Sequence, residues 1–557
     1  MKLSIRLSLS LVLPALVVLQ IPGIALAQDP GALNKNQQET REYYELLQKE
    51  RDTANQEEQP ALVEKPDEPE APKAPAETRR ILVTSFEVSS SEVLSEEQIA
   101  AVTNQYVNKE LNIADIQGVV GEINALYAEQ SNIVARAVLP KQNVQGGVIK
   151  IQLIEARLGA VRVEGNEHTG TRFIEKRVAP EEGALVDLKD LEADLLKFNR
   201  VNDMALRANL APGEEYGTTD IVVLAQEPQN VTFNAFTDNA GRETVGQARL
   251  GAGFQVNSLF GIRDRLSLGG TASEGSSNFY GSYDVPVHRS GTRVAAFFDS
   301  GDIEIVDGPL KELNITGESS NGGLTITQPL MVRQSWDWDA SLGYTHKTSD
   351  SFFDGVKLVN TQADLATLGT NLRFFDKSGT WLTSHAFSFG KSDSVEGRDY
   401  FIYDGSLIRL QYFQNGSSLI FRTNWQLSDT NDLPSFDQII IGGTATVRGY
   451  SEGILAGDQG YVLSAEYAYP MNFIGGDWAQ RKNVFVFFDN GAAFPFRGDS
   501  GSDSTSEDFL ASVGIGLDFD IWQRVSFKVS LGVPLLDDRE IDQDNYKVHA
   551  IFNWNVF

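Results

Sequence analysis

Val525-Ser-Phe-Lys-Val-Ser-Leu-Gly-Val533 alternates apolar residues with polar or small ones. Side chains of a strand point alternately to its two faces, so this stretch predicts a strand with one apolar and one polar face. Leu419–Leu427 and Tyr461–Tyr469 repeat the period of two. All seven Trp residues and most Phe residues follow Pro228, where helical periodicity also ends. Residues 229–557 are therefore expected to form one large antiparallel β-structure.

Two kinds of all-β domain carry such alternation, a soluble sandwich and a membrane barrel. The polar side faces bulk water in the sandwich, whereas in the barrel the apolar side faces lipid and the polar side a wet lumen. We favour the barrel because aromatic residues lie at the ends of apolar runs and the strand pattern continues over about 330 residues without a helix. A sheet in lipid has no open edge, so it must close. At roughly twenty residues per strand and connection, about sixteen strands fit, and single-chain bacterial barrels have even counts.

Residues 1–27 are predicted to be an export signal. Lys2 and Arg6 precede the apolar run Leu7–Ile21, and residues 25–27 (Ala-Leu-Ala) are the small residues that a signal peptidase needs. We expect cleavage before Gln28; the alternative is an uncleaved membrane anchor.

Composition narrows the class of protein further. No segment after residue 27 approaches the roughly eighteen apolar residues of a spanning helix, which excludes a helical membrane protein. The chain has no Cys, so an exported protein here dispenses with disulfides. Its net charge of −29 argues against a nucleic-acid partner, which needs a basic surface.

The mature chain begins with two segments that are too polar to build a core. Residues 28–53 include a predicted helix over Asn36–Arg51, with Tyr43 and Leu47 one turn apart. This helix is either solvated or lies in a wet cavity. Residues 54–79 contain five Pro residues among Glu, Lys and Ala, which predicts a semi-extended, unfolded linker.

Two α/β modules are predicted next, over residues 80–156 and 157–228. In the first, a strand pattern precedes Ser95-Glu-Glu-Gln98, which resembles a capping box, and a second helix is expected from Asp115. Each module reads β-α-α-β-β, and the shared order indicates a tandem repeat. The alternative is two unrelated small domains.

This architecture resembles the TpsB transporters of two-partner secretion, which include the filamentous-haemagglutinin transporter and the haemolysin activators. The modules resemble POTRA domains, and the barrel resembles those of the BamA superfamily. Two motifs carry the resemblance most sharply, and it covers essentially the whole mature chain. One is Val447-Arg448-Gly449-Tyr450, which is similar to the family's motif on a long sixth extracellular loop that folds into the lumen. The other is Phe487-Phe-Asp489-Asn-Gly491, which is similar to a motif on a later barrel strand, and the resemblance implies that Arg448 pairs with Asp489.

Physical chemistry gives that pair a reason of its own. An arginine on a loop in a lumen needs a fixed anion, and a carboxylate accepts its planar fork in two bonds. Gly449 would let the backbone pass close to the barrel wall. We expect a wet lumen to keep the pair modest in energy, so that it fixes position rather than supplying stability. Taken alone, Arg-Gly-Tyr is a weak motif, and its alternative is a surface loop.

The C-terminus departs from the usual barrel ending. Phe557 is terminal, but Val548, Phe552 and Trp554 fall out of phase with it. Either a bulge precedes Phe557, or this residue extends past the last strand.

Signatures of catalysis are missing. There is no Gly-x-Ser-x-Gly elbow and no Walker loop, and the five His residues lack metal-ligand spacing. We therefore expect no enzyme, no catalytic residues, no metal, no cofactor and no nucleotide.

The leading functional hypothesis is an outer-membrane translocase that exports one large secreted protein, with the modules in the periplasm and the barrel as the pore. The modules would bind the N-terminal region of this exoprotein by adding a strand to a sheet edge, and the 28–53 helix would plug the resting pore. The candidate edges run from Asn132 to Leu139 and from Met204 to Leu210, and their named residues are Asn132, Val134, Leu139, Met204, Leu206 and Leu210. The alternatives are a barrel-assembly insertase of the BamA type, a passive porin, and a surface adhesin or receptor. The sequence does not name the cargo, whether adhesin, cytolysin or toxin.

Overall fold

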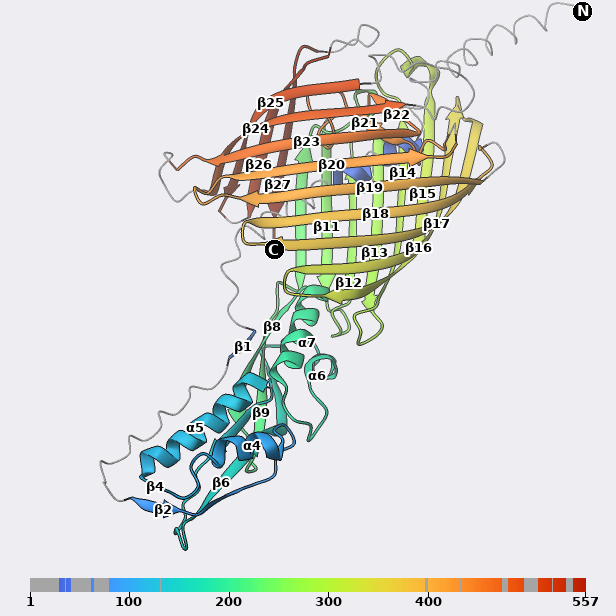
Figure 1. Cartoon of the computed structure of the whole chain (residues 1–557). Helices are drawn as coiled ribbons and strands as arrows, with labels where there is room; N and C mark the ends of the chain where they lie inside the picture. The colour runs from blue at the N-terminus through green and yellow to red at the C-terminus, as the bar shows by residue number, and fades with distance from the viewer. Residues whose placement is uncertain are drawn as a thin grey trace, which may run out of the picture. The chain divides into compact units, whose positions relative to one another are not determined.

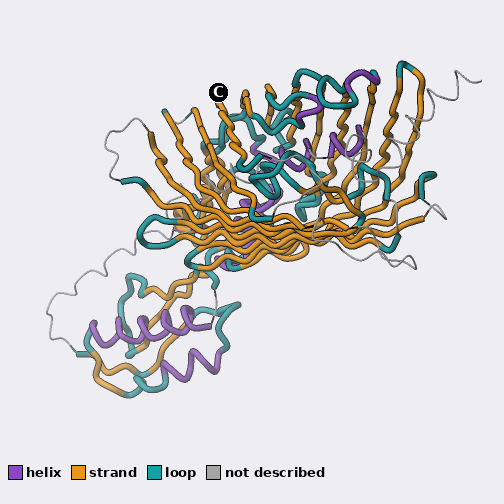
Figure 2. The backbone as a smooth tube through the Cα atoms, turned by 90° about the horizontal axis from the view of Figure 1, so that it is seen from above, coloured by secondary structure: helices purple, strands orange, loops and turns teal. Residues whose placement is uncertain are grey.

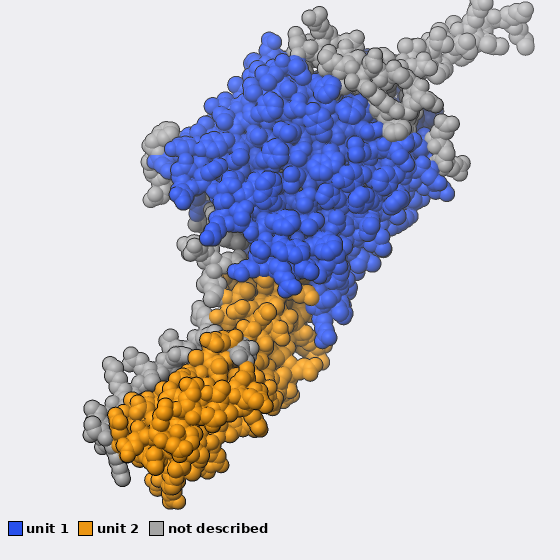
Figure 3. Space-filling model, in the orientation of Figure 1, with its two compact units in different colours: residues 1–57, 229–557 blue, residues 58–228 orange. Residues whose placement is uncertain are grey.

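The computed structural model divides the chain into two compact units, residues 58–228 and residues 1–57 with 229–557 (Figure 3). It describes residues 30–35, 37–41, 62–64, 80–130, 132–395, 399–430, 433–472, 479–494, 509–522, 524–536 and 544–557.

The larger unit is a closed antiparallel barrel of sixteen strands, as predicted (Figure 1). Neighbouring strands along the chain pair in order, and the last strand pairs with the first. The strands are β10 (Val231–Asp238), β11 (Arg249–Asn257), β12 (Arg265–Ala272), β13 (Ser276–Pro286), β14 (Arg293–Glu304), β15 (Ile315–Val332), β16 (Trp336–Phe353), β17 (Val356–Asp376), β18 (Gly379–Ser392), β19 (Asp399–Tyr412), β20 (Ser418–Ser428), β23 (Gln459–Pro470), β24 (Ala479–Phe494), β25 (Phe509–Ile521), β26 (Val525–Pro534) and β27 (Lys547–Asn555). Two short 3₁₀ helices, Glu243–Val245 and Lys311–Leu313, lie in the connections.

The alternation in β26 shows which way the two faces point. Leu531 and Val533 are 38% and 40% exposed, whereas Lys528 and Ser530 on the other face are buried. A soluble sandwich would bury the apolar face, so this inversion is the barrel arrangement, with apolar side chains outside. Within the described residues, no helix is long and apolar enough to cross a membrane.

A helix from the N-terminal segment lies inside the barrel (Figure 2). Residues 30–35 and 37–41 are helical, so the predicted start at Asn36 is wrong, and residues 42–51 lie outside the described part of the chain. The helix contacts the wall mainly through polar groups. The Gly31 N–H donates to Ser349 Oγ at 3.2 Å, and Asn278 Nδ2 donates to Asn34 Oδ1 at 2.8 Å. Polar contacts of this kind suit a wet lumen rather than a core.

The first module is more complex than predicted. Its elements are β2 (Ile81–Val83), β3 (Ser85–Val88), α4 (Glu96–Thr103), β4 (Lys109–Leu111), α5 (Ile113–Gln130), β5 (Ala135–Val138) and β6 (Val148–Glu155). Ser95 and Gln98 form the expected capping box of α4. The extra strand β4 pairs with β2, and α5 begins two residues before the predicted Asp115. Apolar side chains of both helices pack on the three-stranded sheet β3-β6-β5.

The second module has the predicted order, with one addition. Its elements are β7 (Arg157–Glu164), α6 (Thr171–Val178), α7 (Leu188–Val201), β8 (Ala205–Pro212) and β9 (Thr218–Gln226). A further strand, β1 (Val63–Glu64), joins its sheet in the order β1-β8-β9-β7. The linker prediction was therefore wrong here, because composition alone does not reveal a short segment that pairs with a distant edge.

The C-terminal ending follows the second of the two alternatives. β27 stops at Asn555, and the last two residues run past it. The Val556 N–H donates to Phe233 O, the Phe233 N–H donates to Phe557 O, and the two Phe rings stack at 5.9 Å. Phe557 thus continues the contact with the first strand without belonging to the last.

Candidate functional site: a loop folded into the barrel

The connection between β20 and β23 turns back into the lumen instead of standing outside. Every residue from 433 to 450 is buried. The loop carries a small hairpin of its own, formed by β21 (Ile439–Ile441) and β22 (Leu455–Gly457). A surface loop would be exposed, so that alternative fails.

Glycines shape the tip of this loop and bring it against the wall. Gly443 has a φ of +100°, and its N–H donates to Val447 O at 3.1 Å to close a tight turn. Gly449, with a φ of +99°, lies against Gly532 of β26, where a Cβ built on Gly532 would meet Gly449 N at 2.5 Å. Both glycines are needed for this close approach. Sequence reasoning identified Gly449 but missed Gly532.

Arg448 is held by the wall on several sides. Its backbone N–H and Nε donate to Asp489 Oδ2 at 3.1 and 2.8 Å, and its Nη2 donates to Asp489 Oδ1 at 2.9 Å. Its Nη1 donates to Glu466 Oε2 at 2.5 Å, and the guanidinium carbon lies 3.6 Å from the centre of the Phe487 ring. Ser464 donates to Asp489 Oδ1 at 2.7 Å. The carboxylate of Asp489 therefore receives the planar fork in the two-bond arrangement.

The environment of the pair differs from the expected one. The side chains of Arg448 and Asp489 are 4% and 0% exposed, so the pair is enclosed by protein rather than screened by water. Glu466, also buried, accepts a second hydrogen bond from Lys528 Nζ at 2.6 Å. The site is thus a cluster of two cations and two carboxylates. Sequence reasoning missed Glu466 and Lys528, although they lie on the polar faces of the predicted strands Tyr461–Tyr469 and Val525–Val533.

The other motif residues pack around this cluster. Val447 and Tyr450 are fully buried, and the Tyr450 hydroxyl lies 3.1 and 3.0 Å from the carbonyl oxygens of Ala511 and Leu536. A Cβ on Gly491 would meet Val447 at 3.1 Å, so this glycine leaves room for the loop.

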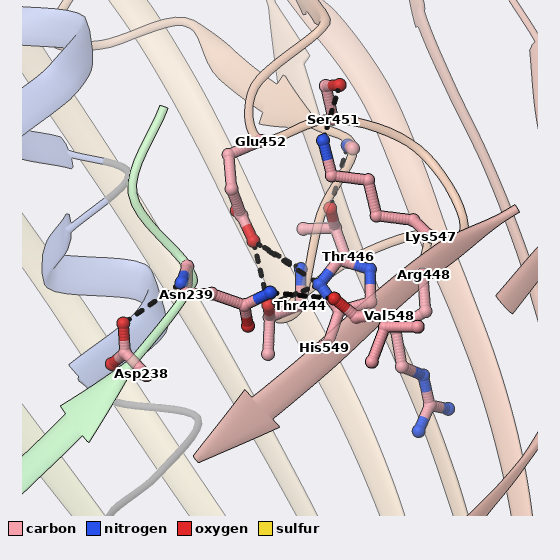
Figure 4. A network of polar contacts seen from close by, with 12 residues as sticks. Asp238, Asn239, Thr444, Thr446, Arg448, Ser451, Glu452, Lys547, Val548 and His549 are labelled. Atoms are coloured by element: carbon pink, nitrogen blue, oxygen red, sulfur yellow. Dashed lines mark hydrogen bonds and ion pairs between the residues drawn. The ribbon is translucent and has the colours of Figure 1, made fainter. Parts of the chain in front are cut away.

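A second set of polar contacts joins the loop to the last strand, as Figure 4 shows, and to the connection after the first strand. The Gly449 N–H donates to His549 Nε2 at 3.3 Å, so Nε2 accepts and Nδ1 carries the proton towards Thr444 Oγ1, 2.9 Å away. Thr444 in turn donates to Glu452 Oε1 at 2.8 Å. Arg242, in the connection after β10, donates to Gly453 O at 3.0 Å. The loop therefore touches both sides of the seam where the barrel closes.

The predicted edges of the modules fare differently. The Val134 N–H donates to Val186 O, and the Leu188 N–H donates to Asn132 O, so the start of the first candidate pairs with the second module. Only Ala135–Val138 remains a sheet edge, and Leu139 follows it.

The second candidate edge is partly covered. Met204, Leu206 and Leu210 are buried in the core of the module, and β1 pairs along β8 at Ala208 and Asn209. Because β1 has only two residues, binding of the exoprotein along the rest of β8 stays a prediction.

Within the described parts of the chain, no three His, Asp or Glu side chains converge as a metal site. The chemistry that the loop site offers is the anchoring of a segment by charge and close packing.

Comparisons with known proteins agree with this architecture. Residues 217–519 match the family model described as haemolysin secretion/activation protein ShlB/FhaC/HecB, and residues 81–156 match the ShlB-type POTRA domain. The chain is 24% identical over 480 residues to the heme/hemopexin transporter protein HuxB of Haemophilus influenzae, covering 82% of this chain and 83% of that one. It is 23% identical to the outer membrane transporter CdiB of Escherichia coli, covering 82% and 80%. The solved structure of CdiB from Escherichia coli superposes with a TM-score of 0.66 over 94% of this chain and 98% of that one, at 20% identity.

Proposed function

Because the chain belongs to the haemolysin secretion/activation protein family, we propose that it is an outer-membrane translocase for one dedicated, large exoprotein. In this proposal the two modules receive the N-terminal region of the exoprotein in the periplasm. The barrel then conducts the unfolded chain to the cell surface.

The observation that carries the proposal is the content of the lumen. A helix held by polar contacts and a loop anchored at Arg448 both lie inside the closed barrel. Both can leave without breaking a strand of the wall, so the lumen can become a path. A passive porin has no use for such contents or for two receiving modules. An insertase of the BamA type shares the barrel: BamA from Haemophilus ducreyi superposes with a TM-score of 0.53 at 14% identity, which bears on the fold alone.

The receiving edge in the first module is proposed to be β5. Ala135–Val138 is the outer strand of its sheet, and an extended segment of the exoprotein can add to it through main-chain hydrogen bonds. The loop cluster is proposed to hold the path closed until the exoprotein engages.

The test pairs this chain with a candidate large exoprotein from its own organism, sought first among the genes next to its own. Both are expressed in a strain that lacks them, and exoprotein in the medium is measured by immunoblotting. Secretion should require this chain, and a matched strain carrying only the exoprotein should retain it in the periplasm. Equal release from the two strains, or retention in both, would contradict the proposal.

A further inference from the structure

One hairpin of the barrel is longer than its neighbour and leaves a strand edge open. β17 pairs with β16 from Val356 onward, but it pairs with β18 only from Ala363, opposite Ser392. After Ser392 the chain turns back towards β19. Among the described residues, Val356–Gln362 therefore have no strand on the β18 side.

The hydrogen bonds fix which groups face the open side. Ser392 Oγ donates to Gln362 O at 2.7 Å, so the backbone of Gln362 points towards β18. Alternate residues of a strand point the same way, so the N–H and C=O of Asn360 face the open side too. A β-bulge at Leu358 bends the strand beyond it, because Ser351 pairs with Val359 and Phe352 with Lys357.

This edge lies on the outer side of the membrane. The modules are periplasmic in this family, and β10, the first strand of the barrel, follows the second module. Counted from β10, the first, third, fifth and every further odd strand therefore runs outward. β16 is the seventh strand, and its turn to β17 is therefore extracellular. The 21 residues of β17 extend about 70 Å, or about 50 Å along the barrel axis after tilting, against an apolar band of about 25 Å. Its first seven residues stand clear of the lipid.

The edge has the character of a strand-pairing site. Val356, Leu358 and Val359 are 64%, 48% and 39% exposed, so apolar side chains accompany the open backbone. Natural proteins usually protect such edges with charges, prolines or bulges. Here the bulge and Lys357, which pairs with Asp350 at 2.8 Å, leave the Val359–Gln362 stretch uncovered in the described structure.

We propose that Val359–Gln362 binds the exported chain by strand addition as it leaves the pore. This inference rests on the proposed function, because an edge of this kind needs an extended backbone and export delivers one to the outer rim. The inner side of the same wall holds the base of the loop: Lys347 of β16 and Tyr400 of β19 both donate to Asp437, at 2.7 and 2.5 Å. A chain that passes this loop emerges beside β17. The first exported strand to pair there would be held outside the pore and could template the next.

The first test separates the backbone of Asn360 from its side chain. Asn360→Pro removes the N–H on the open side and leaves the β16 ladder intact, since prolines are tolerated where the missing N–H faces outward. Asn360→Ala keeps that N–H and removes only the side-chain contacts with Asp350 and Gln362. We expect Asn360→Pro to lower the amount of secreted, protease-resistant exoprotein about five-fold, as for one lost hydrogen bond, with Asn360→Ala near wild type. Heat-modifiable barrel is measured in each strain to show that both variants fold.

The second test uses the absence of Cys from the chain. The substrate is an exoprotein truncated to its N-terminal third, which carries single cysteines and is stalled in the pore by a folded domain at its C-terminus. Asn360→Cys should cross-link to this substrate. Glu318→Cys on β15, which is paired on both sides, should not. Equal secretion by the two Asn360 variants, or cross-linking of Asn360→Cys only to a second copy of itself, would overturn the inference. If the unaltered chain does not secrete the exoprotein at all, the proposed function itself is refuted.

Discussion

Replacing Arg448 with alanine should release the loop from the barrel wall while the barrel itself stays folded. Asp489 receives three of its hydrogen bonds from Arg448 and is fully buried, and Glu466 receives one. The alanine variant retains only the backbone N–H among those donors. Removing one partner of a buried pair costs about 3–5 kcal/mol, because the other charge stays buried without compensation.

This free-energy cost applies only while the loop of the variant stays docked against the wall, so it is the upper limit of the destabilisation. If the loop leaves, water reaches Asp489, so the penalty appears as loop displacement rather than as unfolding. A loss of about 3 kcal/mol lowers the docked fraction of the loop relative to the free one about 100-fold. The sixteen strands are closed by backbone pairing that involves neither side chain, so the amount of barrel should change little.

Three measurements check this reasoning in the same strains. Exoprotein in the medium reports export, proteolysis at residues 433–450 reports loop displacement, and heat-modifiable mobility reports the folded barrel. Arg448→Ala should expose the loop to protease and cripple secretion. Asp489→Ala should resemble it, and the double variant should be little worse than either, as for residues that act as a pair.

Arg409→Ala supplies a control away from the loop, because it also breaks an arginine–aspartate pair, although its partner Asp376 is 46% exposed. It should leave the loop protected and export normal. The reasoning would be refuted by a protected loop with normal secretion in Arg448→Ala, or by loss of the barrel in that variant.

Three further outcomes are expected. Deleting residues 28–53 should raise the resting conductance in planar bilayers, because it empties part of the lumen; unchanged conductance would remove the plug role. Deleting residues 80–156 or 157–228 should abolish export yet leave heat-modifiable barrel, since the barrel strands all follow residue 228; export without both modules would refute their receptor role. Burial raises the pKa of Glu155, but hydrogen bonds from Ser91, Tyr127 and nearby backbone N–H groups outweigh it and lower the pKa below its usual value. A carboxyl group whose pKa is lower in the folded than in the unfolded state stabilises the fold at pH values above its unfolded-state pKa. This stabilisation is lost as the pH falls through the folded-state pKa. Glu155→Gln should therefore cost a 58–228 fragment about 1–3 kcal/mol at neutral pH and flatten its acid-induced loss of stability, measured by urea unfolding across pH; identical pH profiles would contradict this.

The barrel was predictable because its signal is local. Alternation along Val525–Val533 is set by strand geometry, so the sequence alone indicates the strand, and the length of the alternating region indicates about sixteen of them. Burial is not local. Lys528 is simply a polar position in that pattern, and only the fold brings it to Glu466 beside the loop arginine.

The same limit explains the errors. The Arg448–Asp489 pair can be predicted from a motif, but the exclusion of water from this pair depends on the packing of the loop, which no motif encodes. The strand β1 has two residues and no pattern of its own, since its pairing is dictated by the edge of β8. The open edge of β17 also escapes sequence reasoning, because it arises from a difference in length between two hairpins.

The small strand β1 also sets how far the luminal helix can travel. While Val63 stays paired to β8, only the residues between 41 and 62 connect the helix to a fixed point, and they span at most about 70 Å. Because the tether is short, the helix stays close to the lumen after it leaves. Its return is an intramolecular step, and the effective concentration of the helix at the lumen is set by the tether alone. Reclosure should therefore follow first-order kinetics independent of protein concentration, and an open pore must be kept open by whatever occupies it.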